Sequence, residues 1–318
     1  MPPYPFVERQ VYRYLKDMLA HNRAASRATC FQKAVRFCPF YLGADGAKES
    51  VDSQRIVGAA WKSTVKSRLR VGRSPFRVDQ VVALQRAVVD MPRDCDKVVA
   101  GFACCLISVR LRFSDAQNNK EEPWVDEAGD GDDFLELDLG KVKTGNTPSS
   151  HNVKKSAAGH ANGLRGDRWA KAWLAARVRG GRRAKKDGCL LPAYSEQDGW
   201  LRRRMRSQEF NSWLTATLSK LGAAPQKTQK LGSHSGKVTL LTWCSKYGID
   251  RDSRRALGYH ARGKDKSVNA YARDLLSAPL RNLQKVEDAV GRESFDPHVT
   301  RSRHFKNIDE KKDELLIS

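Results

Sequence analysis

Apolar side chains recur every three or four positions between residues 11 and 69, which is the spacing of amphipathic helices. The faces expected to be buried hold Val11, Leu15, Met18 and Leu19, then Phe31, Val35 and Cys38, and then Val57, Ala60, Trp61 and Val65. The middle run is aromatic and basic, and it is followed by Pro39 and a turn from Gly43 to Gly46. The pattern therefore predicts a small helical unit at the start of the chain.

A second unit is expected after a linker of glycine, serine and basic residues that spans residues 70–75. A helix should begin near Val78, and apolar residues then follow two helical patterns, Val81, Leu84 and Val88, and Val98, Phe102, Cys105, Leu106 and Val109. The acidic, glycine-containing stretch 120–133 is typical of a solvated loop. Leu135, Leu137 and Leu139 alternate with acidic residues, which is the period of a half-buried strand.

Three further helices are predicted towards the carboxyl end of the chain. One is basic and spans residues 168–179, and a second is amphipathic, contains Phe210 and Leu214, and stops at Gly222. The third opens at His234, carries its apolar face on Val238, Leu241 and Cys244, and stops at Gly248. We expect Trp169, Trp173 and Trp213 to pack in the core. The fold class is thus mainly α with a small antiparallel β-sheet.

The charge of the chain narrows the class of partner. Its 318 residues include 58 lysines and arginines against 36 acidic residues, so the formal net charge is +22 and polyanions are attracted. No segment approaches the roughly 20 apolar residues of a membrane span, and no signal peptide is recognisable. The seven cysteines are scattered and lack metal-ligand spacing. We expect a soluble protein of a reducing compartment whose leading class of partner is nucleic acid and not a membrane.

The sequence motifs with the clearest chemistry lie between residues 234 and 271. His234 and Lys237 are three positions apart and share a helical face, Leu257-Gly258-Tyr259-His260 ends the next element, and Tyr271 follows. This order resembles the tyrosine recombinase family, which includes phage integrases and recombinases of mobile elements. Two earlier motifs fit the same order. Arg112-Phe113-Ser114-Asp115 resembles the family's first-arginine motif, and Lys143-Thr144-Gly145 resembles its hairpin lysine.

The resemblance implies a site-specific DNA recombinase or integrase with a helical core-binding domain at residues 1–72, a catalytic domain at 73–290 and a tail at 291–318. Its catalytic residues would be Arg112, Lys143, His234, Lys237, His260 and Tyr271. The tyrosine would form a 3′-phosphotyrosine intermediate, without ATP, metal or another cofactor. The family also implies a homo-tetramer on double-stranded DNA, in the nucleus of a eukaryote or otherwise in the cytoplasm with the DNA.

Two features depart from the family pattern, and they leave alternatives open. Lys237 stands where arginine is usual, and the gap of eleven positions from His260 to Tyr271 is slightly long, so Tyr259 is a rival nucleophile. Lys141 is a close alternative to Lys143. The alternative functions are a decayed or domesticated recombinase that only binds DNA, a topoisomerase-like enzyme that nicks and reseals DNA, and a basic RNA-binding or structural protein.

Overall fold

The computed structural model describes residues 7–21, 23, 25–44, 46–67, 72–119, 121–127, 133–139, 155–226, 229–259 and 276–299. Over these residues the protein is mainly helical, with short antiparallel sheets, as the sequence predicted. The chain divides into two compact units, Met1–Gly72 and Arg73–Ser318. No helix in the described ranges combines the length and the apolar character needed to cross a membrane.

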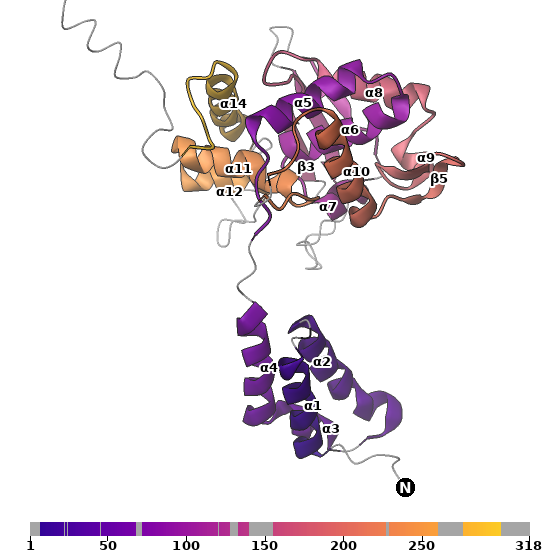
Figure 1. The fold of residues 1–318 in the computed structure, drawn as a ribbon, viewed down its shortest axis with the longest axis vertical. Coiled ribbons are helices and arrows are strands. Elements are labelled where there is room, and N and C mark those ends of the chain that lie inside the picture. Colours follow the sequence, from indigo (N-terminus) through magenta and orange to yellow (C-terminus); the bar gives the residue numbers. More distant parts are fainter. Residues whose placement is uncertain are drawn as a thin grey trace, which may run out of the picture. The chain divides into compact units, whose positions relative to one another are not determined.

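The first unit consists, in its described part, of α1 (Glu8–Ala20), α2 (Ala25–Leu42), α3 (Ala47–Asp52) and α4 (Gln54–Ser67) (Figure 1). Val11, Leu15 and Met18 are buried as predicted. The predicted face of α4 was right at Ala60, which is buried, and wrong at Val57 and Trp61, which are exposed. Ile56 and Ala59 are buried with Ala60, because these three residues also follow helical spacing, on a neighbouring stripe.

The second unit is built around α6 (Asp94–Ser108), which packs against α5 (Val78–Asp90) and α8 (Trp169–Arg179) (Figure 1). Trp169 and Trp173 are fully buried, and the indole of Trp173 donates to the carbonyl of Val98 at 3.0 Å. A Cβ at position 101 would lie 2.1 Å from Trp173 Cδ1, so the glycine there is required for this contact. Core packing of these two tryptophans is confirmed, while Trp213 is only partly buried.

A three-stranded antiparallel sheet lies in the second unit, in the order β1 (Trp124–Asp126), β2 (Phe134–Leu139) and β3 (Lys155–His160). The alternating leucines of β2 are buried, which confirms the predicted strand. The prediction of a loop at 120–133 was wrong for β1, which pairs with β2 so that Val125 lies opposite Leu135. A separate hairpin joins β4 (Pro192–Ser195) and β5 (Gly199–Arg204).

The remaining described helices are α7 (Phe113–Gln117), α9 (Ala184–Asp187), α10 (Ser207–Lys220), α11 (Ser235–Tyr247), α12 (Arg251–Leu257) and α14 (Ser277–Gly291). α10 and α11 are followed by Gly222 and Gly248, whose positive φ angles of 72° and 97° favour glycine at helix ends. The described chain after α14 packs onto the same unit. Phe295 is buried against the ring of Tyr247, with 5.1 Å between the centroids.

Candidate active site

Arg112 lies where the buried helix α6 gives way to the short helix α7. The chain turns at Arg110, whose φ is +55°, and Arg112 then takes the N-cap position of α7. The Arg112 guanidinium is partly exposed and lies 3.5 Å from the carboxylate of buried Asp115. Asp115 therefore holds the arginine at the surface, as expected for a structural partner.

His234 and Lys237 are positioned by the start of α11, where His234 is the N-cap residue. The Ser235 hydroxyl accepts a hydrogen bond from the Gly232 amide at 3.1 Å, which closes the turn. A Cβ at position 236 would lie 2.7 Å from Cβ of Leu106, so Gly236 allows α11 to approach α6 closely. Because α6 leads directly to the Arg112 turn, this close packing brings the two motifs together.

Lys237 is a buried cation, with only 5% of its surface exposed. Its ammonium donates to the carbonyl of Gly258 at 2.7 Å and lies 5.7 Å from the ring centre of Tyr259. The pKa of Lys237 is lowered from 10.5 to about 8, first by burial and then by the charge of Arg112, while nearby Asp115 opposes the shift. At neutral pH the side chain is thus mostly charged, and it loses its proton within the mildly alkaline range.

His234 is exposed and lies within the same positive field. Its pKa is lowered from 6.5, first by loss of hydration on the side that faces the protein, and then by the charges of Arg112, Lys237 and Arg73. The imidazole is therefore neutral at neutral pH and can accept a proton. The described residues of the predicted site, Arg112, His234 and Lys237, accordingly form one cationic cluster.

Tyr259, the rival nucleophile, has its hydroxyl turned towards the interior. The hydroxyl donates to the carbonyl of Ala158 at 3.3 Å and accepts from Arg110, also at 3.3 Å. Burial raises the pKa of Tyr259, which makes the attacking phenolate harder to form. The other predicted residues, Lys143 with its alternative Lys141, His260 and Tyr271, lie outside the described residues.

Two arginines near the cluster were not predicted. Arg73 belongs to the segment that was interpreted as a linker, and its guanidinium donates to the Leu231 carbonyl at 3.1 Å, next to the α11 turn. Arg110 lies two positions before Arg112 and is fully buried. A basic residue beside an apolar helix end is common in sequences, so neither carried a signal that could have distinguished it.

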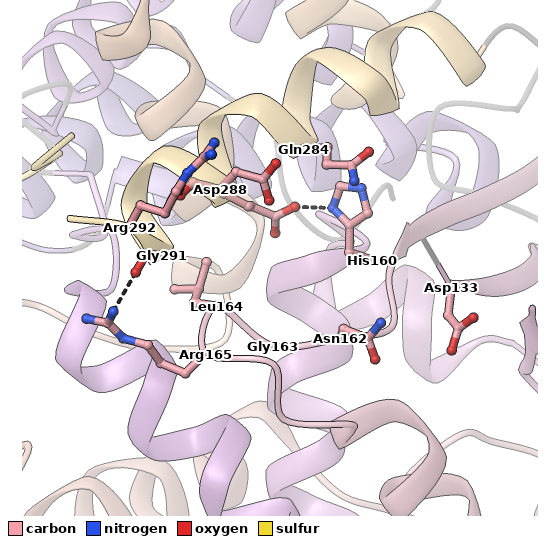
Figure 2. A pocket seen from close by; sticks show the side chains of 11 residues that line it. Asp133, His160, Asn162, Gly163, Leu164, Arg165, Gln284, Asp288, Gly291 and Arg292 are labelled. Carbon is pink, nitrogen blue, oxygen red and sulfur yellow. Dashed lines mark hydrogen bonds and ion pairs between the residues drawn. The ribbon is translucent and has the colours of Figure 1, made fainter. Parts of the chain in front are cut away.

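A cavity of about 490 Å³ lies elsewhere in the second unit, between the loop after β3 and α14 (Figure 2). His160 contacts the carboxylate of Glu287 at the edge of this cavity. Arg112, His234 and Lys237 do not line this cavity. Within the part of the chain that the structure describes, no three histidine, cysteine or acidic side chains are grouped as metal ligands.

The sequence matches no protein-family model, and no curated protein matches it. Among solved structures, the chain is similar to one titled "FLP Recombinase-Holliday Junction Complex I", with 14% identity and a TM-score of 0.41. The match covers 81% of this chain and 61% of that one, so it spans less than two thirds of the length of that recombinase chain.

Proposed function

We propose that the protein binds double-stranded DNA and breaks and rejoins it through a covalent bond between Tyr271 and a 3′ phosphate. The observation that supports this function is that Arg112, more than a hundred positions earlier in the sequence, lies close enough to His234 and Lys237 to lower the pKa of both. Attack on a phosphodiester is favoured at a site that concentrates positive charge. This site also holds one neutral imidazole and a buried ammonium.

The cationic residues have a task in the transition state. As the tyrosine oxygen attacks phosphorus, negative charge increases on the non-bridging oxygens. Arg112, Lys237 and His260 would donate hydrogen bonds to these oxygens. A preorganised donor of this kind contributes roughly 100-fold to 1000-fold to the rate. Lys237 needs no reorganisation for this role, because its ammonium is already held by the Gly258 carbonyl and stripped of most of its water.

The proposed proton transfers combine this cluster with the roles that the family resemblance gives to Tyr271 and Lys143. The Tyr271 hydroxyl gives its proton to the neutral imidazole of His234 as the new bond to phosphorus forms. The bond from phosphorus to the 5′ oxygen breaks, and Lys143 would protonate that oxygen. The phosphotyrosine keeps the energy of the original phosphodiester, so attack by a free 5′-hydroxyl reverses the step and rejoins the strands. The net charge of +22 supports DNA as the substrate, and the family resemblance suggests a tetramer.

The test is covalent trapping on nicked DNA. The full chain is incubated with a pool of duplexes of randomised sequence, each carrying one nick from which the short 5′-hydroxyl fragment can diffuse away after cleavage. The expected result is a protein–DNA adduct that survives denaturation and maps to Tyr271. Tyr271→Phe should abolish the adduct, because phenylalanine has no nucleophilic oxygen, whereas Tyr259→Phe should still form it.

Other outcomes separate the alternatives. An adduct on Tyr259 would contradict the assigned nucleophile. Salt-dependent duplex binding without any adduct would support a protein that only binds DNA. An adduct that reseals its own strand, but never joins two different duplexes, would indicate nicking and resealing. Exchange of strands between duplexes that carry distinguishable labels is expected if the protein is a recombinase.

A further inference from the structure

Two residues with unusual backbone geometry meet beneath the candidate active site. In the described chain, positive φ outside glycine occurs at Arg110, Tyr259 and Glu293, and the first two share a φ of +55°. The left-handed conformation costs a non-glycine residue about 1 kcal/mol or more. The Arg110 guanidinium lies 3.3 Å from the Tyr259 hydroxyl. Two residues with unfavourable backbone conformations are thus in contact through their side chains.

The guanidinium of Arg110 is fully buried and bonded almost entirely to backbone carbonyls. It donates to Leu257 O at 3.1 Å, to Ala158 O at 2.8 Å, and to Ser108 O. No carboxylate in the described ranges forms an ion pair with it. These carbonyls belong to three elements, since Ser108 ends α6, Ala158 lies in β3 and Leu257 ends α12.

Two of the three elements joined by Arg110, α6 and α12, lead to the candidate site. The end of α6 leads within four residues to Arg112. The end of α12 leads to Gly258, whose carbonyl accepts from the Lys237 ammonium, and Tyr259 follows immediately. The guanidinium therefore lies between the turn that presents Arg112 and the turn that holds Lys237.

We propose that Arg110 is a positioning residue for DNA cleavage, which fixes the 258–259 turn against Lys237 and sets where the chain towards His260 and Tyr271 begins. This inference rests on the proposed function. Arginine suits the role because its five donors lie in a rigid plane and serve several acceptors at once, whereas lysine has a single flexible ammonium. Arg110 acts through Gly258 and Tyr259 and not on DNA itself.

The alternative explanation is that Arg110 only stabilises the fold. Arg177 provides a matched control. Arg177 in α8 is also fully buried and donates to the Leu190 carbonyl, and it differs from Arg110 in that it also forms an ion pair with Glu122. It is absent from the charges that shift the pKa of Lys237 or His234. Lysine at either position keeps the charge and removes the planar group, so the two variants lose comparable packing at different places.

The experiment compares Arg110→Lys with Arg177→Lys in the full chain. Single-turnover adduct formation on the trapped duplex and DNA affinity are measured for each variant. Arg110→Lys should slow adduct formation by about 10-fold to 100-fold with DNA affinity unchanged, because small misplacements of catalytic groups cost this much. Arg177→Lys should leave the rate per folded molecule close to that of the wild type. Equal slowing by both variants would overturn the proposal.

A second readout needs no DNA. The pKa of Lys237 is measured by NMR of ¹³C-labelled lysine, assigned with Lys237→Met. In Arg110→Lys the 258–259 turn loosens and water reaches Lys237, so its pKa should rise from about 8 towards 10.5, while Arg177→Lys leaves it unchanged. An unchanged pKa in both variants would also overturn the proposal. Absence of any wild-type adduct would contradict the proposed function alone, since this titration still tests positioning.

Tyr259→Phe provides an independent variant if Arg110→Lys does not fold. It removes one acceptor of Arg110 and one donor to the Ala158 carbonyl, and it keeps the ring beside Lys237. Adduct formation should be slowed less than in Arg110→Lys, with the adduct still on Tyr271. A rate equal to that of the wild type, together with an unchanged Lys237 pKa, would show that the contact between Arg110 and Tyr259 positions nothing.

Discussion

Two buried cations in the second unit, Arg177 and Lys237, are stabilised in opposite ways. The Arg177 guanidinium lies 2.9 Å from the carboxylate of Glu122, so one charge compensates the other. Lys237 instead donates to a backbone carbonyl and has the positive charges of Arg112 and Arg110 nearby. The burial of its charge is compensated only by the dipole of the Gly258 carbonyl and, in part, by the carboxylate of Asp115.

The difference indicates what each region is for. A buried charge with a partner can be retained for packing and geometry, whereas a buried charge among like charges lowers the stability of the fold. Strongly perturbed cations in a cluster are typical of sites that bind anions or perform catalysis. We therefore interpret the region of Arg177 as stabilising the fold. We interpret the region of Lys237 as a site whose buried positive charge is compensated when a phosphate binds.

The largest expected effect is the loss of activity in Lys237→Met. Methionine fills a similar volume but offers no donor to the transition state, so adduct formation should fall by about 100-fold to 1000-fold. The measurement is the single-turnover rate on the nicked duplexes. Lys246→Met is the control, because Lys246 lies on the same helix and also donates to a backbone carbonyl, that of Pro297, but is exposed. Equal losses in the two variants would contradict a specific role for Lys237.

The second largest expected effect is a loss of stability when the other buried cation, Arg177, is replaced. Arg177→Met should lower the free energy of unfolding by about 3 kcal/mol, since removal of one partner of a buried ion pair costs about 3–5 kcal/mol and Glu122 is partly solvated. Denaturant unfolding measures the loss. Arg179→Met is the control two positions later, because exposed Arg179 pairs with Asp94 at 2.6 Å and such surface pairs contribute about 1 kcal/mol or less. Similar losses would show that the Arg177 pair adds nothing special.

Much of the fold followed from local pattern. The start of α5 at Val78, the alternating leucines of β2 and the end of α11 at Gly248 each depend on spacing and helix stops within a few residues. The errors arose where tertiary contacts decide. The short strand β1 exists because β2 pairs with it, and the buried stripe of α4 was chosen by α1 and α2, which no local pattern reveals.

The candidate site was predicted in part, for a related reason. Arg112, His234 and Lys237 belong to recognisable short motifs, so their residue types and order pointed to them before any geometry was known. Arg110 acts by bonding to backbone carbonyls, which every residue possesses, and such acceptors leave no trace in the sequence. The burial of Lys237 was likewise hidden, because it depends on the approach of α11 to α6 at Gly236.

The smallest expected effect is a pH dependence of stability that belongs to Lys237. Its pKa is about 8 when folded and near 10.5 when unfolded, so below pH 8 the charged form is buried at full cost. Between pH 8 and 10.5 the unfolded state binds more protons, and stability must rise with pH until the cost is gone.

This pKa difference corresponds to about 3 kcal/mol, and the hydrogen bond to Gly258 offsets about 1 kcal/mol. Lys237→Met should therefore be more stable than the wild type by about 2 kcal/mol at neutral pH, and denaturant unfolding across this range should show the advantage vanish as pH rises. An advantage that does not change with pH would mean that packing, and not the buried charge, separates the two proteins.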